Sequence, residues 1–219
     1  MSLTLVAVPI GNLGDITLRA LETLKTCDLI IGEERKPMFK LLKSLGLPTP
    51  ENFELLNEHS EKDDILRIAK ICSQKKVALI TDCGTPGFSD PGAELVKACR
   101  KLNTPVTSNP GASSLTTFIS LTGVKLKQFH FEGFLPRESS DREKRLKQLS
   151  QFKLPIILMD TPYRLKKTLG ECSEHFKQKY CVLGMDLTKE NEEILSGSFT
   201  DVIKKYDGTK REFLMLIKP

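Results

Sequence analysis

Short apolar runs alternate with amphipathic segments through the first half of the chain, and this alternation constrains the fold more than any other feature. Apolar runs at 3–8, 29–32 and 77–81 are each followed by a segment whose apolar residues recur at helical spacing. A fourth run is expected near 105–108. Strands that alternate with helices pair in parallel and carry helices on both faces of the sheet. The pattern therefore predicts an α/β fold with a mostly parallel, Rossmann-like sheet.

The second half has shorter connections between its expected strands, which favours antiparallel pairing. We expect two α/β domains, residues 1–115 and 116–219, the second with a mixed or antiparallel sheet. Asp15 is expected to cap the first helix, and Ser140 to Glu143 reads as a capping box. The strands expected in the second half are 129–134, 154–159, 181–187, 193–195 and 213–217.

Composition indicates a soluble globular protein rather than a disordered or disulfide-rich one. Of 219 residues, 39% are hydrophobic and 28% are charged, with a formal net charge of +5. The six cysteines form no Cys-x-x-Cys pair and are expected to be reduced and buried. No secretion signal and no membrane span are expected, so the predicted compartment is the cytoplasm. The basic excess lies after residue 118 and permits a phosphate-bearing partner, although solvated helix faces give the same pattern.

Common catalytic signatures are absent from the sequence. It holds no Walker A loop, no strand-linked G-x-G-x-x-G, no H-E-x-x-H and no G-x-S-x-G. His59, His130 and His175 lack ligand-like spacing, so we expect no metal site.

Three loops at the carboxyl ends of predicted strands are the main candidates for a binding site, because an open α/β sheet binds its ligands there. They read VPIGNLGDITLRAL at 8–21, TDCGTPGFSDPG at 81–92 and NPGASS at 109–114. Glycine and proline punctuate any strand-to-helix connection. Three such loops in one half of a chain are harder to explain by turn chemistry alone.

These loops, together with FEGFLP at 131–136, the segment at 161–165 and DLTKENEEI at 186–194, resemble the tetrapyrrole methylase superfamily. Within it the chain is most similar to the ribosomal RNA small-subunit methyltransferase I branch. The resemblance covers nearly the whole chain in the same order.

The resemblance implies a two-domain, S-adenosylmethionine-dependent methyltransferase, usually a homodimer, with the cofactor in a cleft between the domains. It also implies 2′-O-methylation of a cytidine in the decoding region of 16S rRNA, and hence 16S rRNA or the small ribosomal subunit as partner. Matched by position, the implied cofactor contacts are Pro9, Ile10, Gly84, Thr85, Pro86, Phe88, Ser113, Ser114, Met159, Gly184 and Met185.

A ribose hydroxyl is a poor nucleophile, so a base is expected near it. Glu33 and Glu34 follow a predicted strand and match an acidic pair of the family, while His59 matches its His-Asn-Glu stretch; Glu58 and Glu61 are further candidates. A pair of solvated carboxylates capping the next helix explains Glu33 and Glu34 equally well. A hydrogen-bonded structural histidine likewise explains His59.

The chain departs from the family pattern around the expected substrate site. Met159 to Tyr163 stand where the family has Tyr-Glu-x-Pro-His, Met185-Asp186 replace Arg-Glu, and Arg211-Glu212 replace Gly-Glu. Two alternatives therefore stay open: a methyltransferase for a tetrapyrrole-like or other small molecule, and a non-catalytic cofactor-binding module. The basic candidates for RNA contact are Lys125, Lys127, Arg137, Arg142, Lys144, Arg145, Lys147, Arg164, Lys166 and Lys167.

Overall fold

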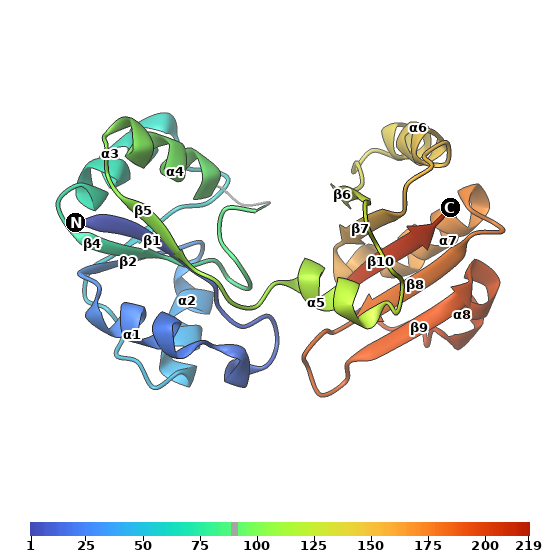
Figure 1. Ribbon diagram of the computed structural model, residues 1–219, viewed down its shortest axis with the longest axis horizontal. Coiled ribbons are helices and arrows are strands. Elements are labelled where there is room, and N and C mark those ends of the chain that lie inside the picture. Colours follow the sequence, from blue (N-terminus) through green and yellow to red (C-terminus); the bar gives the residue numbers. More distant parts are fainter. Residues whose placement is uncertain (89–91) are drawn as a thin grey trace. The chain divides into compact units, whose positions relative to one another are not determined.

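The computed structural model describes residues 1–88 and 92–219, and contacts divide the chain into two compact units, Met1–Ser113 and Ser114–Pro219 (Figure 1). Each unit is built on a five-stranded sheet. The predicted α/β class, with a parallel N-terminal sheet and a mixed C-terminal sheet, is confirmed.

The N-terminal sheet is entirely parallel, with strand order β3-β2-β4-β1-β5. Its strands are β1 (Ser2–Val6), β2 (Leu29–Gly32), β3 (Phe53–Leu55), β4 (Lys76–Leu79) and β5 (Val106–Asn109). Its helices are α1 (Leu18–Thr26), α2 (Arg35–Ser44), α3 (Lys62–Cys72) and α4 (Gly92–Lys101). The short edge strand β3 was not predicted, because three residues are too few to show a periodic pattern.

Successive residues of the central strands enter two different hydrophobic cores. In β2, Leu29 and Ile31 pack with the residues of α3 and α4, whereas Ile30 packs with those of α1 and α2. The two helix pairs cover opposite faces of the sheet (Figure 1). This two-sided burial explains why these strands read as continuous apolar runs.

The first helix begins later than the sequence indicated. Leu13–Asp15 form a 3-10 turn, and the hydroxyl of Thr17 accepts the Ala20 N–H at 3.1 Å as the N-cap of α1. The prediction that Asp15 caps this helix is therefore wrong. The sequence also predicts that Asp90 and Pro91 cap the helix that follows them, and these two residues lie outside the described part of the chain.

The C-terminal sheet has strand order β6-β7-β10-β8-β9, with β6 and β7 parallel and the other neighbours antiparallel. Its strands are β6 (His130–Phe134), β7 (Ile156–Asp160), β8 (Tyr180–Met185), β9 (Glu193–Ser198) and β10 (Phe213–Lys218). Its helices are α5 (Ser114–Leu121), α6 (Ser139–Leu149), α7 (Leu165–His175) and α8 (Phe199–Lys205).

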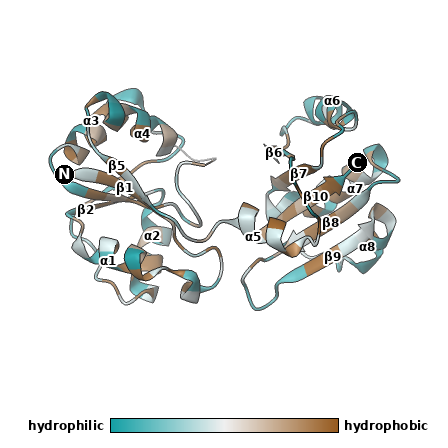
Figure 2. Ribbon diagram, viewed as in Figure 1, coloured by the Kyte–Doolittle hydropathy of each residue, from teal (hydrophilic) through white to brown (hydrophobic). Residues whose placement is uncertain are grey.

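One face of this sheet packs on α6, α7 and α8 through Leu146, Leu169 and Phe199, whereas Phe118 of α5 packs on Gly184 of β8. Figure 2 shows β10 in brown and most of α6 in teal, as expected for a central strand and a surface helix. The capping box predicted at Ser140 is absent, since α6 begins at Ser139 with Glu138 as N-cap. None of the helices in the described part of the chain combines the length and apolar character needed to cross a membrane.

Candidate functional site

The three glycine-containing loops of the N-terminal unit meet at the carboxyl ends of β1, β4 and β5, which are neighbours in the sheet. Val8 and Gly84 join the first two loops through a pair of backbone hydrogen bonds: the Val8 N–H donates to the Gly84 oxygen at 2.9 Å, and the Gly84 N–H donates to the Val8 oxygen at 3.1 Å. Gly84 has φ +80°, a region that favours glycine. The second loop therefore depends on glycine at this position.

The third loop is joined to both others. The Thr85 hydroxyl donates to the Ala112 oxygen at 3.0 Å, and the Ala7 N–H donates to the Asn109 oxygen at 3.2 Å. A Cβ on Gly111 would lie 3.0 Å from the Cβ of Ala7, so the two backbones approach as closely as a glycine allows. Segments far apart in the sequence thus form one connected surface.

Buried Asn109 anchors this surface to α1. Its side-chain amide donates to the Thr23 hydroxyl at 2.6 Å and to the Arg19 oxygen at 3.3 Å. Such a buried amide with satisfied hydrogen bonds holds the end of β5 in place. The sequence analysis placed Asn109 in the third loop. Its hydrogen bonds to α1 could not be predicted, because no local pattern links it to residues so distant in the sequence.

Of the predicted cofactor residues in these loops, Pro9, Gly84 and Pro86 are buried and Phe88 is 53% exposed. Ile10, Thr85, Ser113 and Ser114 are half-buried, with Ser114 as the first residue of α5. The surface combines small residues, apolar side chains and main-chain groups. This composition fits a ligand with an apolar body and a few polar groups, such as a nucleoside cofactor.

Carboxylates lie beside this surface at the ends of β2 and β4. Glu33 is half-buried and Glu34 is exposed; Glu34 occupies the N-cap position of α2 without a side-chain capping bond. The Glu34 N–H donates to the side chain of Asp82. Asp82 is exposed as a residue, but partial burial of its carboxyl raises the pKa, and the negative charge of Glu34 adds to the rise. Asp82 was not singled out in the sequence, although its position directly after β4 was a usable signal.

The predicted base His59 lies in the turn after β3. Its side chain is 85% exposed, and its Nε2 atom is 3.7 Å from Glu58 Oε1. The backbone of the turn is organised by the Asn57 side chain, which accepts the His59 N–H at 3.0 Å. The imidazole thus lies on the surface beside Glu58, at a distance from its carboxylate that is too long for a hydrogen bond.

The three predicted cofactor residues of the C-terminal unit lie on β7 and β8, the two strands that flank β10 in the sheet. Met159 is half-buried in β7, and Gly184 and Met185 are buried in β8. A Cβ on Gly184 would lie 2.6 Å from the Phe118 ring, and the Met185 side chain belongs to the hydrophobic core. Packing therefore accounts for the glycine at 184 and for the buried side chain of Met185.

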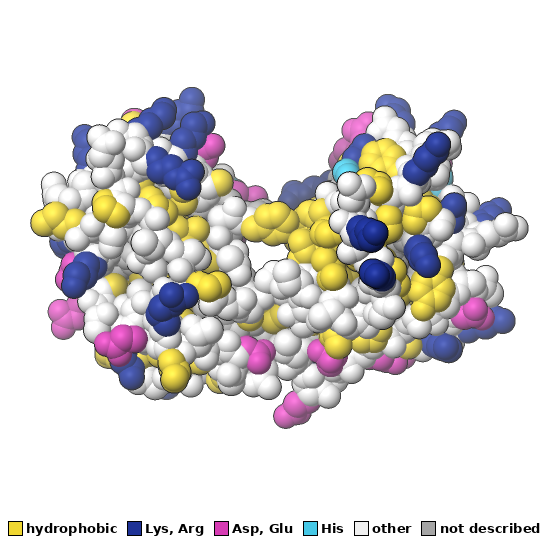
Figure 3. Space-filling model, viewed as in Figure 1, with side chains coloured by type: hydrophobic (Ala, Val, Ile, Leu, Met, Phe, Trp, Pro, Cys, Tyr) yellow, Lys and Arg dark blue, Asp and Glu magenta, His cyan; other side chains and the backbone are white. Residues whose placement is uncertain are grey.

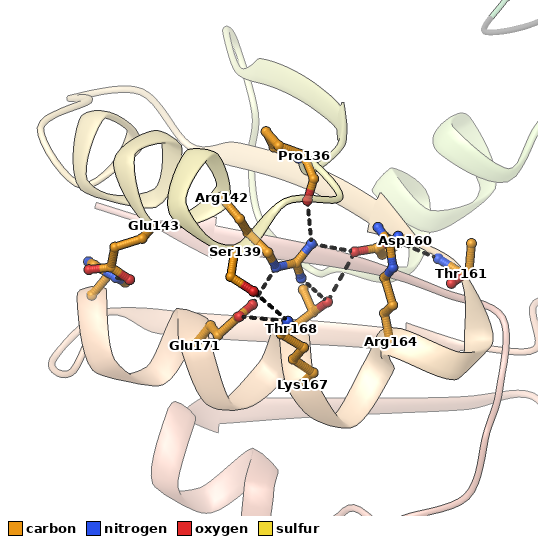
Figure 4. Close-up of polar contacts among 11 residues, drawn as sticks. Pro136, Ser139, Arg142, Glu143, Asp160, Thr161, Arg164, Lys167, Thr168 and Glu171 are labelled. Carbon is orange, nitrogen blue, oxygen red and sulfur yellow. Dashed lines mark hydrogen bonds and ion pairs between the residues drawn. The ribbon is translucent and has the colours of Figure 1, made fainter.

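A buried ion network lies directly after Met159 (Figure 4). The guanidinium of Arg142, 1% exposed, donates to Asp160 Oδ2 at 2.9 Å, to the Thr168 hydroxyl at 2.5 Å and to Glu171. Asp160 Oδ1 in turn accepts the Thr161 N–H at 2.9 Å. Arg142 was expected among the phosphate-binding residues, and that expectation is wrong because the side chain is inaccessible.

A second network surrounds Arg211, which replaces a glycine of the family pattern. Its guanidinium donates to Asp186 at 2.8 Å, to Glu193 at 2.5 Å and to the Asn191 oxygen. Burial opposes ionisation of Asp186, but the hydrogen bonds from Arg211 and Lys189 lower its pKa below the ordinary value. The two segments that depart from the family pattern, 185–186 and 211–212, therefore contact each other through Asp186 and Arg211.

Across residues 1–88 and 92–219, no three His, Cys, Asp or Glu side chains gather closely enough to hold a metal ion.

On the face drawn in Figure 3, Lys and Arg side chains gather over α4 in the N-terminal unit, and in the C-terminal unit they are spaced among hydrophobic side chains.

The sequence of this chain is similar to a known protein family and to several of its members. A family model described as Tetrapyrrole (Corrin/Porphyrin) Methylases matches residues 2–203. The chain is 38% identical to the ribosomal RNA small subunit methyltransferase I of Synechocystis sp., covering 98% of this chain and 78% of the relative. The protein of the same name from Thermotoga maritima is 35% identical, covering 95% of this chain and 93% of the relative.

Solved structures share the fold at lower sequence identity. A diphthine synthase superposes with a TM-score of 0.73 at 16% identity, covering 100% of this chain and 90% of that chain. The uroporphyrin-III C-methyltransferase of Thermus thermophilus, complexed with S-adenosylhomocysteine, gives a TM-score of 0.65 at 14% identity, covering 100% of this chain and 97% of that chain.

Proposed function

Because the chain belongs to the tetrapyrrole methylase family and is a methyltransferase, we propose that it transfers a methyl group from S-adenosylmethionine to RNA of the small ribosomal subunit. The relatives from Synechocystis and Thermotoga, which match nearly the whole chain, are named for that activity. The acceptor that we propose is the 2′-hydroxyl of a cytidine in the decoding region of 16S rRNA.

The observation that carries the proposal is the joining of the three loops at the ends of β1, β4 and β5. The Val8–Gly84 bridge and the Thr85–Ala112 hydrogen bond hold together the segments that match the family's cofactor loops. Ligands of open α/β sheets bind at such strand ends. The main-chain groups of Pro9 and Ile10 are the proposed polar contacts to the nucleoside, Gly84 allows the ligand to approach the backbone closely, and Ser113 and Ser114 supply hydroxyls.

S-adenosylmethionine, when bound, supplies an electrophilic methyl group on a sulfonium. In the transfer the bond from the ribose oxygen to the methyl carbon forms, the bond from sulfur to that carbon breaks, and S-adenosylhomocysteine leaves. The hydroxyl proton passes to a base of this chain. The loops contribute mainly by alignment, since in-line displacement depends on the geometry of nucleophile, methyl and leaving group.

The base is proposed to be a carboxylate of the group formed by Glu33, Glu34 and Asp82. A general base works best when its pKa lies near the operating pH. Burial and the charge of Glu34 move the pKa of Asp82 in that direction. His59, exposed beside Glu58, is kept as a second candidate.

Met159, Gly184 and Met185 remain predicted cofactor contacts of the C-terminal unit.

We further propose that the protein works as a homodimer in the cytoplasm, where ribosomal subunits are assembled in bacteria.

The test is methyl transfer from labelled S-adenosylmethionine to small ribosomal subunits that lack the modification, with naked 16S rRNA and a no-enzyme reaction as controls. A labelled 2′-O-methylcytidine in the decoding region is the expected product. If the protein binds the cofactor in calorimetry but labels neither RNA, the rRNA acceptor is wrong, and a small-molecule acceptor or a non-catalytic cofactor-binding module replaces it.

A further inference from the structure

Tyr163 is the most exposed of the three tyrosines, and it lies in a segment, 159–163, that departs from the family pattern near the expected substrate site. The residue is 77% exposed, directly after the carboxyl end of β7. The ammonium group of Lys210 lies 4.8 Å from the centroid of its ring. Segments distant in the sequence therefore bring an aromatic face and a cation together on the surface.

Arg164 adds a second cation next to this pair. Its Nη1 lies 3.5 Å from Asp160 Oδ1, and its side chain is 29% exposed. The segment 161–169 contains three basic residues and no acidic one. We call Tyr163, Arg164 and Lys210 the tyrosine patch.

Both sides of the tyrosine patch are held by buried charges. Asp160, fixed by Arg142 and Thr168, accepts the Thr161 N–H at the start of the 3-10 turn that carries Tyr163 (Figure 4). On the other side, Lys210 directly precedes Arg211, whose guanidinium is bound to Asp186 and Glu193. A binding group held in place before the ligand arrives loses less conformational freedom on binding.

The chemistry of the patch fits single-stranded RNA. An exposed aromatic ring stacks on an unpaired base of any identity, and neighbouring cations bind the flanking phosphates. Lys210 lies over one face of the Tyr163 ring, and the high exposure of the residue leaves ring surface accessible to a base. We infer that the tyrosine patch is an RNA contact in which Tyr163 stacks on an unpaired base of the acceptor and Lys210 and Arg164 bind its phosphates. This inference rests on the proposed rRNA acceptor and adds a substrate-binding site to it.

The test compares variants of the full-length protein for binding of a fluorescein-labelled single-stranded RNA by fluorescence anisotropy. Tyr163→Ala is expected to weaken binding roughly tenfold, and Tyr163→Phe to retain it, because stacking needs the ring and not the hydroxyl. Lys210→Gln is expected to weaken binding. It should also reduce the slope of log affinity against log salt concentration by about 1, the change expected for the loss of one phosphate contact.

The opposite end of the same sheet offers a matched control. Tyr180, 41% exposed, is paired in register with Lys218, so Tyr180→Ala and Lys218→Gln remove an exposed tyrosine and an adjacent lysine outside the tyrosine patch. In methyl transfer to small subunits, Tyr163→Ala should raise KM with little change in kcat, because the ring is proposed to bind the RNA and takes no part in the transfer of the methyl group or the proton. Affinity for S-adenosylmethionine should stay at the wild-type value.

Equal RNA affinity of Tyr163→Ala and Tyr180→Ala would overturn the inference. It would also be overturned if Tyr163→Ala lowered affinity for intact subunits but not for naked RNA, since the patch would then bind ribosomal protein. If the wild-type protein binds RNA but methylates no ribosomal RNA, the proposed function is refuted. Loss of RNA binding in Tyr163→Ala would still support the tyrosine patch in that case.

Discussion

The ring of Phe118 lies directly against the backbone of Gly184, so closely that a Cβ on Gly184 would be 2.6 Å from Phe118 Cδ2 and 3.2 Å from Ile194 Cδ1. Phe118 itself is fully buried. Glycine at 184 is therefore explained by the packing of α5 on β8, whatever else it contacts.

Gly184→Ala is expected to lower the free energy of unfolding by about 1–3 kcal/mol, because the new methyl group overlaps a ring that has no room to move. Urea denaturation measures the change. The double variant with Phe118→Leu should recover part of the loss, since the smaller side chain vacates the space. Gly170→Ala is the control: nothing lies within 4 Å of its added Cβ in α7, so stability should stay or rise by up to about 1 kcal/mol.

Arg142→Met is expected to destabilise the C-terminal unit by about 3–5 kcal/mol, because it leaves the buried Asp160 Oδ2 without the guanidinium that binds it at 2.9 Å. Denaturant unfolding is again the measurement. Lys144→Met, which removes a cation 73% exposed and 3.5 Å from Asp141, should change stability by less than about 1 kcal/mol. Similar effects of the two substitutions would contradict the structural role of the buried network.

Thr85→Val is expected to weaken binding of S-adenosylmethionine by roughly threefold to tenfold. It removes the hydrogen bond to the Ala112 oxygen that joins two of the proposed cofactor loops, while it keeps the size of the side chain. Isothermal titration calorimetry measures the affinity. Thr26→Val, which removes a comparable bond to the Glu22 oxygen within α1, is expected to bind as the wild type does.

Asp82→Asn is expected to reduce kcat by about a hundredfold or more if Asp82 accepts the hydroxyl proton. Since the pKa of Asp82 is raised, the wild-type kcat should increase with pH through that pKa, where the carboxyl loses its proton and becomes a base. Glu34→Gln removes a neighbouring negative charge, so the same increase should move to lower pH.

The pH profile of single-turnover methyl transfer tests this assignment. Asp63→Asn, an exposed position in the first turn of α3, should leave both kcat and the profile unchanged. A profile that is identical in the wild type and Glu34→Gln would assign the base elsewhere, with Glu33 and His59 as the remaining candidates.

The periodic patterns of strands and helices were read correctly, whereas the expectation that all six cysteines are buried was wrong, because Cys83 is exposed. The buried runs of β2 and β4 and the helical spacing in α3 predicted a two-sided parallel sheet, because burial on both faces requires near-continuous apolar strands. The loops at 81–92 and 109–114 were identified from glycine and proline, whose backbone preferences are local. Helix starts were less certain: Asp15 and Thr17 are both good N-cap residues, and only the path of the chain selected Thr17.

The sequence by itself thus determined the fold class, the family and the loops from which the cofactor site is proposed, since each depends on residue periodicity or on a contiguous motif. Tertiary structure alone decided which side chains meet across the fold: Val8 with Gly84, Asp82 with Glu34, Arg142 with Asp160, and Tyr163 with Lys210. It also turned Arg142 from an expected phosphate ligand into a buried structural cation. The physical reason is that burial and charge pairing depend on distances in space, which a linear pattern of residue types does not contain.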